Sequence, residues 1–257
     1  MATSPANTTR FTTLVADYVA ARPDYPAAAF QAMTEGLAAP VAAADVGCGT
    51  GISTRGLAAW VDHLTGVEPN QAMLDAARAA GGRARMGPIE WRCAPAERTA
   101  LPEGSVHLVL AAQAFHWFDA AAALAEFRRI AAPGGRAALL WNLRDDTCPA
   151  TAAFSRICVP EANRGLDATT IAARGAGGTP LSTAPGWRGY RRMEFRNAQP
   201  LDLPGLLGRA RSASYFPREP APRAAAEAAL REAFERHARD GVFTMHYRVE
   251  LHLAERA

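Results

Sequence analysis

The chain has 257 residues, 49% of them hydrophobic, which is enough to bury a sizeable core in one elaborated domain or in a core with a cap. Its formal net charge is only +3 and it has no dense basic run, which argues against a protein that binds nucleic acid. No apolar run approaches the roughly 18 residues of a membrane helix and no secretory signal opens the chain. We therefore expect a cytoplasmic protein that does not bind membranes.

The charge is spread unevenly along the chain. Residues 1–150 hold 12 arginines and 14 acidic residues, whereas residues 151–257 hold 16 arginines and 11 acidic residues. A basic second part favours an anionic small substrate. The four cysteines show neither a C-x-x-C pair nor a zinc-like grouping with histidine, so we expect free thiols and no metal site.

Two helices are expected before the first strand, over residues 11–21 and 27–38. Pro23 ends the first of them, because the residue that precedes a proline is pushed out of the helical region. We expect residues 1–40 to form a helical cover on the domain that follows.

A glycine-rich turn comes next, in the stretch 41–51 with the sequence VAAADVGCGTG. Its apolar run ends in Asp45 and predicts a buried strand, and a helix is predicted over residues 53–60. Three glycines stand at alternate positions between them: Gly47, Gly49 and Gly51. Glycine lets the backbone approach a ligand closely, so this order of strand, turn and helix is typical of a nucleotide-type site at the carboxyl end of a sheet strand. A structural turn that binds nothing is the alternative.

The glycine spacing separates two kinds of ligand. A dinucleotide site needs G-x-G-x-x-G, and its third glycine would fall on Ile52, so a dehydrogenase is disfavoured. The observed G-x-G-x-G, preceded by a carboxylate, resembles the glycine-rich motif of class I S-adenosylmethionine (SAM)-dependent methyltransferases. SAM carries a sulfonium and an ammonium group, which favour nearby carboxylates and carbonyls, and it has no pyrophosphate for a helix N-terminus to hold.

Glu68 provides the second signal. It follows a short strand predicted over residues 64–67 and stands 21 positions after the first glycine of the turn. In Rossmann-like sheets a carboxylate at this point accepts hydrogen bonds from both ribose hydroxyls. A solvated glutamate at a strand end is the alternative. Asn70 is expected to cap a helix over residues 71–80.

The alternation of strand and helix continues through strands over residues 89–93, 106–111 and 136–141 and a helix over residues 124–132. The string LAEFRRIAAPGGRAALLWN resembles the L-x-E-x-x-R-x-x-x-P-G-G stretch of type 11 methyltransferases, where Pro-Gly-Gly turns a helix into the fifth strand. The chain departs from that family at His107, where an aspartate is common. The strings R-P-x-Y-P, H-W-F and W-N resemble the trans-aconitate-methyltransferase-like subgroup.

This resemblance implies an α/β fold. We expect a Rossmann-like three-layer sandwich whose mostly parallel seven-stranded sheet contains one antiparallel strand, with a helical lid. The remaining elements are helices over residues 149–158, 168–174, 203–213 and 222–239 and strands over residues 189–197 and 243–253. The predicted domains are the cover (1–40), a SAM-binding core (41–145), a substrate cap with one sheet strand (146–241) and a C-terminal strand (242–257).

The resemblance also implies site residues. The predicted cofactor-binding residues are Tyr18, Arg22, Asp45, Gly47, Gly49, Gly51, Glu68, Pro69, Met73, Ala96, Glu97, Gln113 and Trp117. The predicted substrate-binding residues are Tyr18, Tyr25, His116, Trp117, Trp141, Asn142 and Tyr215. His116 is the candidate general base, with packing against Trp117 as the alternative, and Arg22 is either a partner for the SAM carboxylate or a surface arginine.

The function that follows is transfer of a methyl group from SAM to an N or O atom of a small molecule, leaving S-adenosylhomocysteine (SAH). The aromatic residues of the predicted wall favour a heteroaromatic acceptor. The alternatives are methylation of a carboxylate on a small organic acid and a SAM-binding protein without turnover. We expect a monomer or homodimer.

Overall fold

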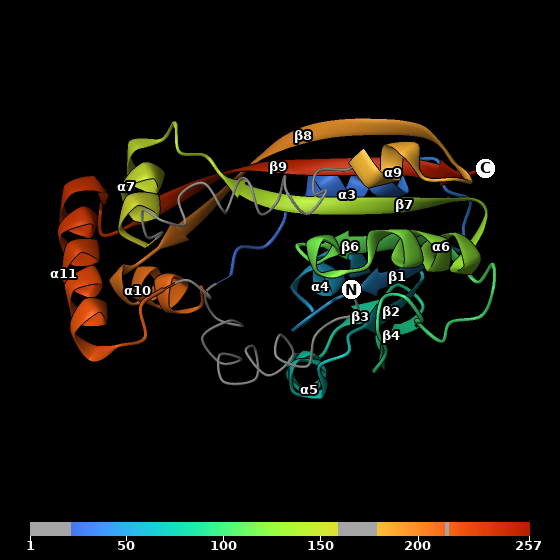
Figure 1. Ribbon diagram of the computed structural model, residues 1–257, viewed down its shortest axis with the longest axis horizontal. Coiled ribbons are helices and arrows are strands. Elements are labelled where there is room, and N and C mark those ends of the chain that lie inside the picture. Colours follow the sequence, from blue (N-terminus) through green and yellow to red (C-terminus); the bar gives the residue numbers. More distant parts are fainter. Residues whose placement is uncertain (1–21, 159–178, 214–215) are drawn as a thin grey trace.

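A seven-stranded mixed sheet organises the protein in its computed structural model, which describes residues 22–158, 179–213 and 216–257 (Figure 1). The strands run in the order β5-β2-β1-β6-β7-β9-β8. They are β1 (Ala42–Val46), β2 (His63–Val67), β5 (Glu90–Arg92), β6 (Val106–Ala112), β7 (Ala131–Arg144), β8 (Trp187–Leu201) and β9 (Phe243–Arg256). The first five pair in parallel, and β9 runs antiparallel to β7 and β8 between them. The predicted fold class is confirmed.

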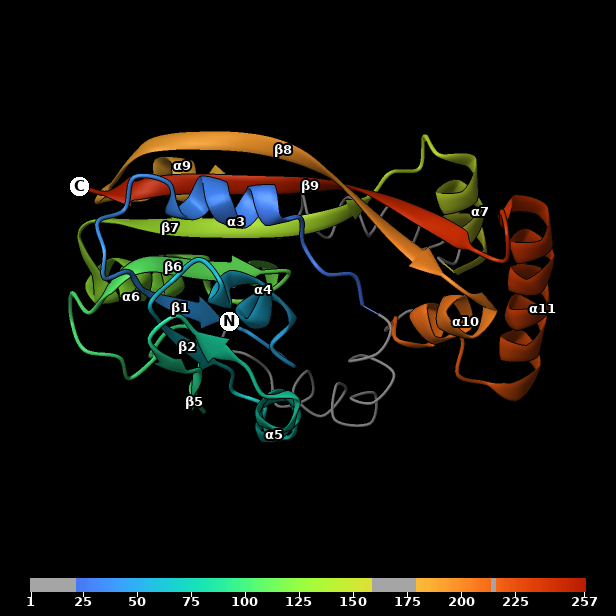
Figure 2. The ribbon, with the colours of Figure 1, turned by 180° about the vertical axis from the view of Figure 1, so that it is seen from behind.

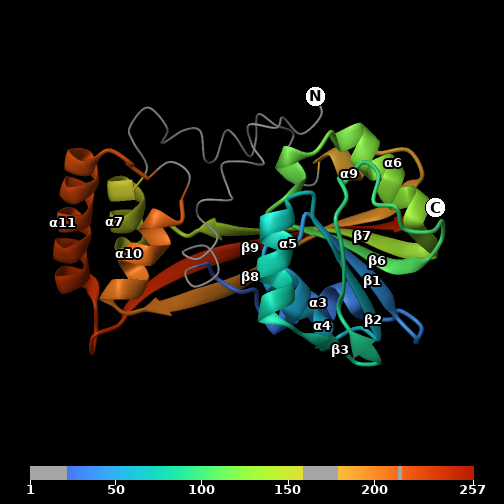
Figure 3. The same ribbon diagram turned by 90° about the horizontal axis from the view of Figure 1, so that it is seen from below.

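Helices cover both faces of the sheet (Figure 3). On one face lie α3 (Ala27–Thr34) and α4 (Ile52–Ala58), which bury Phe30, Met33 and Leu57 against the sheet. Figure 2 shows α3 lying along β7 and β9. On the other face lie α6 (Ala120–Ile130) and α9 (Thr179–Thr183). The predicted helices over residues 11–21 and 168–174, with Tyr18 and Tyr215, lie outside the described residues.

Side chains next to the strands set the ends of several elements. Helix α5 (Gln71–Ala80) has the predicted bounds because the Asn70 side chain accepts hydrogen bonds from the N–H groups of Ala72 and Met73, at 3.0 and 3.2 Å. His107 stands where the resembled family commonly has an aspartate. Its Nδ1 accepts a hydrogen bond from the N–H of Ala42 at 3.1 Å, which joins β6 to the start of β1.

A group of helices forms a cap at the end of the sheet toward which the parallel strands run (Figure 1). It consists of α7 (Pro149–Cys158), α10 (Leu203–Arg211) and α11 (Pro220–His237). They pack with the distal ends of β8 and β9 into a hydrophobic cluster of their own, which includes Phe154, Leu206, Leu230 and Phe243. The cap therefore stands on the side of the sheet where the glycine turn opens.

Several elements differ from the sequence prediction. Strand β8 continues past its predicted end to Leu201, which pairs with Phe243 beside the cap, whereas β9 continues past its predicted end to Arg256, which pairs with Trp187 at the other end of the sheet. The predicted Pro-Gly-Gly turn is an irregularity within β7, where the partner of β6 shifts from Ala131 at Val106 to Arg136 at Leu108. Three short elements were not predicted: the ribbon of β3 (Arg83–Ala84) and β4 (Gly87–Pro88), the 3-10 helix η1 (Phe115–Trp117), and α9.

Three further observations limit the kinds of site available. Among the residues described, no helix is long and apolar enough to cross a membrane. Within the same residues, no group of three or more His, Cys, Asp and Glu side chains could hold a metal ion. All four cysteines are free thiols.

Candidate active site

The glycine turn joins β1 to α4 in a backbone shape that only glycine adopts easily. Gly47, Gly49 and Gly51 have φ angles of 72°, 55° and 79°. The N–H groups of Gly47 and Cys48 both donate to the carbonyl of Val67, at 2.8 and 3.1 Å, which ties the turn to the end of β2. A Cβ atom at Gly47 would lie 2.6 Å from Cβ of Ala114, so a side chain has no room there.

Asp45, near the end of β1, bonds to the helix that follows the turn. Its side chain is fully buried, and Oδ2 accepts hydrogen bonds from the hydroxyls of Ser53 (2.7 Å) and Thr54 (2.6 Å) at the start of α4. Its Oδ1 has no hydrogen-bond partner among the described residues. Burial raises the pKa of this carboxyl to about 6, although the two hydroxyls oppose the shift. Asp45 thus orients the turn and places a negative charge beneath it.

Glu68 holds the same turn from the side. Its carboxylate accepts hydrogen bonds from the N–H of Gly49 (3.0 Å) and from the N–H of Asn70 (2.9 Å). Burial raises the pKa of Glu68, and these two backbone donors oppose the shift. Each carboxylate oxygen has a second lone pair, so Glu68 can accept further hydrogen bonds from a ligand.

A small cavity of about 70 Å³ lies between the glycine turn and the cap. It is lined by Arg22, Pro23, Tyr25, Gly47, Cys48, Gly49, Thr50, Ile52, Ser53, Ala112, Gln113, Asn142, Arg209 and Tyr247. Two of these residues are arginines. None of the described residues that line the cavity is an aspartate, glutamate or histidine.

Six residues predicted from the sequence line this cavity: Arg22, Tyr25, Gly47, Gly49, Gln113 and Asn142. Gln113 stands at the end of β6 with a φ angle of 51°, which is uncommon for a residue other than glycine. Its N–H donates to the carbonyl of Leu140 and its Nε2 donates to the carbonyl of Asn142, at 2.8 and 2.9 Å. The strained backbone thereby turns this side chain toward β7.

The cap contributes two lining residues that the sequence prediction missed, Arg209 and Tyr247. Arg209 is 5% exposed, and its Nε donates to the Tyr247 hydroxyl at 3.4 Å. The Arg209 guanidinium also lies 5.9 Å from the centre of the Phe154 ring. A sign of this role was present in the sequence, because helical spacing places Arg209 beside Leu206 on the apolar face of α10.

Other predicted residues lie outside the lining of the cavity, including the buried carboxylates Asp45 and Glu68. Ala96 is buried in the core, and Met73 is buried beside the turn, with its Cε 3.7 Å from the position of a Cβ at Gly49. Pro69 follows Glu68, and its carbonyl lies 3.6 Å from Sγ of Cys93. Gly51 completes the turn but does not reach the cavity.

Most of the predicted aromatic residues, and the predicted catalytic residue, also do not line the cavity. Trp141 is 1% exposed and packs edge-on against His252, with ring centroids 5.5 Å apart, so it belongs to the core. Glu97 accepts a hydrogen bond from the N–H of Asp119 at 2.9 Å. His116 and Trp117 lie in η1 with their ring centroids 5.0 Å apart. Only Tyr25 of the described aromatic candidates reaches the cavity.

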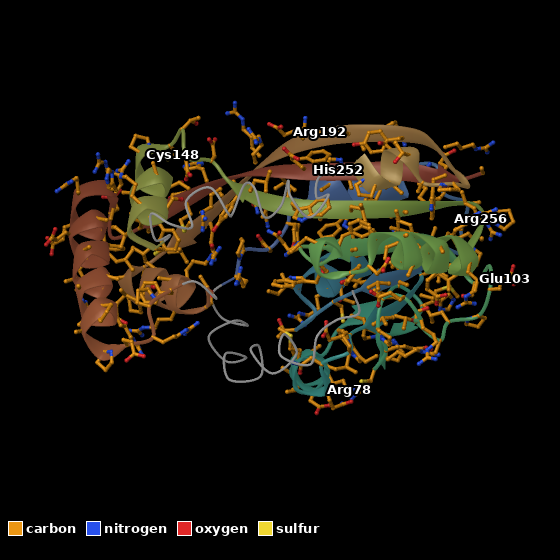
Figure 4. All side chains as sticks on the ribbon, in the orientation of Figure 1. Arg78, Glu103, Cys148, Arg192, His252 and Arg256 are labelled. Atoms are coloured by element: carbon orange, nitrogen blue, oxygen red, sulfur yellow. The ribbon has the colours of Figure 1, made fainter. Side chains whose placement is uncertain are left out.

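A second group of ionisable side chains lies on the outer strands, where Figure 4 labels Arg192 and His252. Arg192 pairs with Glu250 at 2.5 Å, and His252 Nδ1 lies 2.8 Å from the Tyr190 hydroxyl. Burial lowers the pKa of His252. None of these residues lines the cavity, so the group stabilises the pairing of β8 with β9.

The residues around the turn fit SAM. Glu68 would offer a carboxylate to hydroxyl donors, and a Cβ at Gly49 would have Met73 Cε as its nearest neighbour, at 3.7 Å. Arg22 lines the cavity and would offer a cation to the amino-acid carboxylate of SAM, and the buried charge of Asp45 would favour a cationic ligand.

Comparison with known proteins agrees with this geometry. Residues 44–139 match a family model described as a methyltransferase domain. A putative type II methyltransferase from Anaeromyxobacter dehalogenans has a similar structure: 27% sequence identity and a TM-score of 0.59, covering 91% of this chain and 96% of that one.

The curated relatives match a shorter part of the chain. An uncharacterised methyltransferase-like protein of Schizosaccharomyces pombe is 36% identical over 150 residues, 57% of each chain. An uncharacterised methyltransferase of Mycobacterium tuberculosis is 39% identical over 138 residues, 53% of each chain. The similarity therefore spans a little over half the length of these relatives.

Proposed function

We propose that this chain, in which residues 44–139 form a methyltransferase domain, transfers a methyl group from SAM to an N or O atom of a small molecule. The observation that carries the proposal is the cavity, which joins the glycine turn of the domain to side chains of the cap. The turn lies on one side of this cavity and Arg209 and Tyr247 on the other, so a donor and an acceptor would meet different residues. The trans-aconitate-methyltransferase-like subgroup stays a prediction.

In this proposal the two ends of the cavity have different roles. The glycine turn and Arg22 hold the donor, with Glu68 bonded to Gly49 next to the lining, while Tyr25, Asn142 and the cap residues surround the acceptor. SAM supplies an activated methyl carbon, so the protein needs mainly to align the nucleophile with that carbon and to exclude water. Such positioning provides about 7–11 kcal/mol in favourable cases.

A carboxylate acceptor is the second candidate, and the charge of the cavity favours it. Two arginines and no acidic side chain occur among the described lining residues. SAM brings one carboxylate, so an anionic acceptor would pair with the second arginine. A carboxylate is also deprotonated at neutral pH, so its methylation needs no general base.

His116 lies in η1 outside the lining of the cavity and stays the candidate base of the sequence prediction, and its substitution separates the two kinds of acceptor. If the nucleophile arrives protonated and His116 takes its proton, His116→Ala should lower kcat by about 10²–10⁴-fold while SAM affinity is nearly unchanged. If the acceptor is a carboxylate, the same change should affect mainly the acceptor KM. A variant that matches the wild type in both parameters would assign His116 to packing beside Trp117.

The experiment that tests the proposal is a screen of small acceptors with methyl-labelled SAM. We expect label to pass to at least one class of heteroaromatic amine, phenol or organic acid. A protein that binds SAM but transfers no label to any class, including its own side chains, would favour the alternative of a SAM-binding protein without turnover.

A further inference from the structure

Three amide side chains form a connected row across the sheet at the rim of the cavity. Gln113 ends β6, Asn142 lies near the end of β7, and Asn197 lies on β8. Gln113 Nε2 donates to the carbonyl of Asn142 at 2.9 Å, and Asn197 Nδ2 lies 3.2 Å from Oδ1 of Asn142. Asn142 and Asn197 stand on either side of β9, opposite Val249 and Tyr247 respectively.

This amide row holds a single backbone atom, the carbonyl oxygen of Asp24. Asn142 Nδ2 donates to it at 2.9 Å and Asn197 Nδ2 donates to it at 2.8 Å. A carbonyl oxygen has two lone pairs, so these two donors satisfy it fully. The segment that contains Asp24 is thereby fixed to two strands that are not neighbours in the sheet.

The segment so held, residues 22–26, is called the strap here. Its residues Arg22, Pro23 and Tyr25 line the cavity. The strap also reaches the cap, because Arg22 donates through NH2 to the carbonyl of Ser212 at 3.0 Å, just beyond α10. The edge of the Tyr25 ring meets Phe30 of α3, with centroids 6.2 Å apart. The strap therefore connects the core, the cavity and the cap.

We infer that Asn197 is a positioning residue: it does not line the cavity, but by holding the carbonyl of Asp24 it sets the place of Arg22 and Tyr25 within it. Asn197 donates both to the Asp24 carbonyl and to Oδ1 of Asn142, so its loss removes one bond to the strap and one bond to the other amide that holds the strap. The role assigned to Arg22 as a donor-binding residue comes from the proposed function. The inference about the strap itself does not depend on it.

Asn197→Asp is the informative variant, since aspartate keeps the shape of the side chain and removes both N–H donors. Arg196→Ala is the matched control: it is the neighbouring residue on β8, it is exposed, and it points to the opposite face of the sheet. Asn197→Ala provides a second variant without the added negative charge. Thermal unfolding of all three should first show that the proteins are folded.

The first measurement is hydrogen exchange in the unliganded protein. Loss of one hydrogen bond to the Asp24 carbonyl should speed exchange in a peptide that covers residues 22–30 by about fivefold to tenfold in both Asn197 variants and not in Arg196→Ala. Unchanged exchange in the two Asn197 variants would overturn the inference, whatever ligand the protein binds.

The second measurement is the affinity for SAH in a double-mutant cycle with Arg22→Met. We expect Asn197→Ala alone to weaken SAH about fivefold to tenfold, but to add little once Arg22 is replaced, because both act through the strap. Full additivity, when Arg22→Met alone weakens SAH, would overturn the inference, whereas no effect of Arg22→Met would count against the donor role of Arg22 in the proposed function. If the wild type bound no SAH, the proposed function would fail, and the exchange measurement would still decide the role of Asn197.

Discussion

At the residue scale, the burial of the Asp45 carboxyl lowers the free energy of unfolding at neutral pH. The native carboxyl keeps its proton up to about pH 6, whereas an unfolded aspartate loses it near pH 3.9. Between these values the native state binds more protons than the unfolded chain, so the free energy of unfolding falls as pH rises. Above pH 6 the loss is complete and amounts to at most about 3 kcal/mol.

We therefore expect Asp45→Asn to gain stability relative to the wild type as pH rises from 4 to 7. Asparagine can still accept hydrogen bonds from Ser53 and Thr54, but it carries no buried charge. Urea unfolding at several pH values measures the difference. A difference in unfolding free energy that is the same at pH 4 and pH 7 would show that Asp45 does not titrate in this window.

Glu68 should control donor affinity. Removing a charged hydrogen-bond acceptor costs about 1.5–3 kcal/mol, so Glu68→Ala should weaken SAM and SAH alike by about tenfold or more. Gly49→Val should abolish binding, because valine is strained at a φ of 55° and fills the space beside the turn. Titration calorimetry compares both variants with Glu90→Ala, an exposed position on β5. Unchanged affinity in both variants would refute the site assignment.

Arg209 should select the acceptor. If it pairs with an anionic acceptor, Arg209→Met should raise the acceptor KM about tenfold or more while SAM affinity stays within about twofold. Arg209→Lys keeps the charge but loses the planar guanidinium, so its acceptor KM should lie between the values for the wild type and for Arg209→Met. Steady-state kinetics with an organic acid measures this. Loss of SAM affinity in Arg209→Met, with an unchanged acceptor KM, would assign Arg209 to the donor instead.

At the residue scale, the positions of the turn glycines and of Glu68 were predictable from the sequence, whereas their roles toward a ligand stay predictions. The glycines of the turn and Glu68 follow directly on strands whose apolar pattern is plain. Trp141 was not predictable in the same way, because the choice between core and cavity depends on β9, which brings His252 against it from more than 100 residues away. Arg209 and Tyr247 reach the cavity only through the packing of the cap.

At the scale of elements, the cap is stabilised by its own cluster. Leu230 of α11 is fully buried there with Phe154 and Phe243, whereas the clusters on the two faces of the core contain other residues. Arg211 and Arg223 both pair with Glu227, which links α10 to α11 and lowers the pKa of Glu227 to about 2. The cap should therefore be able to loosen while the core remains folded.

The variant Leu230→Ala tests this independence. Its cavity should cost about 2–5 kcal/mol, and the loss should appear as faster hydrogen exchange in α7, α10 and α11 with little change in β1 and β6. Val242→Ala, at a position that is 39% exposed, provides the control and should change little. Equal loss of protection in the core and the cap would mean that they unfold as one unit.

The elements themselves were largely predictable, and the exceptions have physical reasons. Helices α5 and α7 have the predicted bounds, since a cap at Asn70 and a proline at the first turn mark their starts. The ribbon of β3 and β4 has only two residues in each strand, which is too short for a periodic pattern. The extra length of β8 and β9 depends on the pairing of each with the other, because residues 198–201 of β8 pair with residues 243–246 of β9 and Trp187 pairs with Arg256.

At the scale of the whole molecule, the sheet carries both the glycine turn and the cap at the carboxyl end of its parallel strands. Strands β1, β2 and β6 end at the glycine turn, Glu68 and Gln113, respectively. Strands β7, β8 and β9 extend past that rim and carry the cap (Figure 1). The cavity lies where these two parts meet. We propose that this cavity binds SAM.

Calorimetric titration of the wild-type protein with SAM, SAH and NAD tests that claim most directly. We expect SAM and SAH to bind at a single site with a Kd in the low-micromolar range or below, about −8 kcal/mol, and NAD to show no binding at the same concentrations. Saturable binding of NAD with none of SAM or SAH would contradict the account.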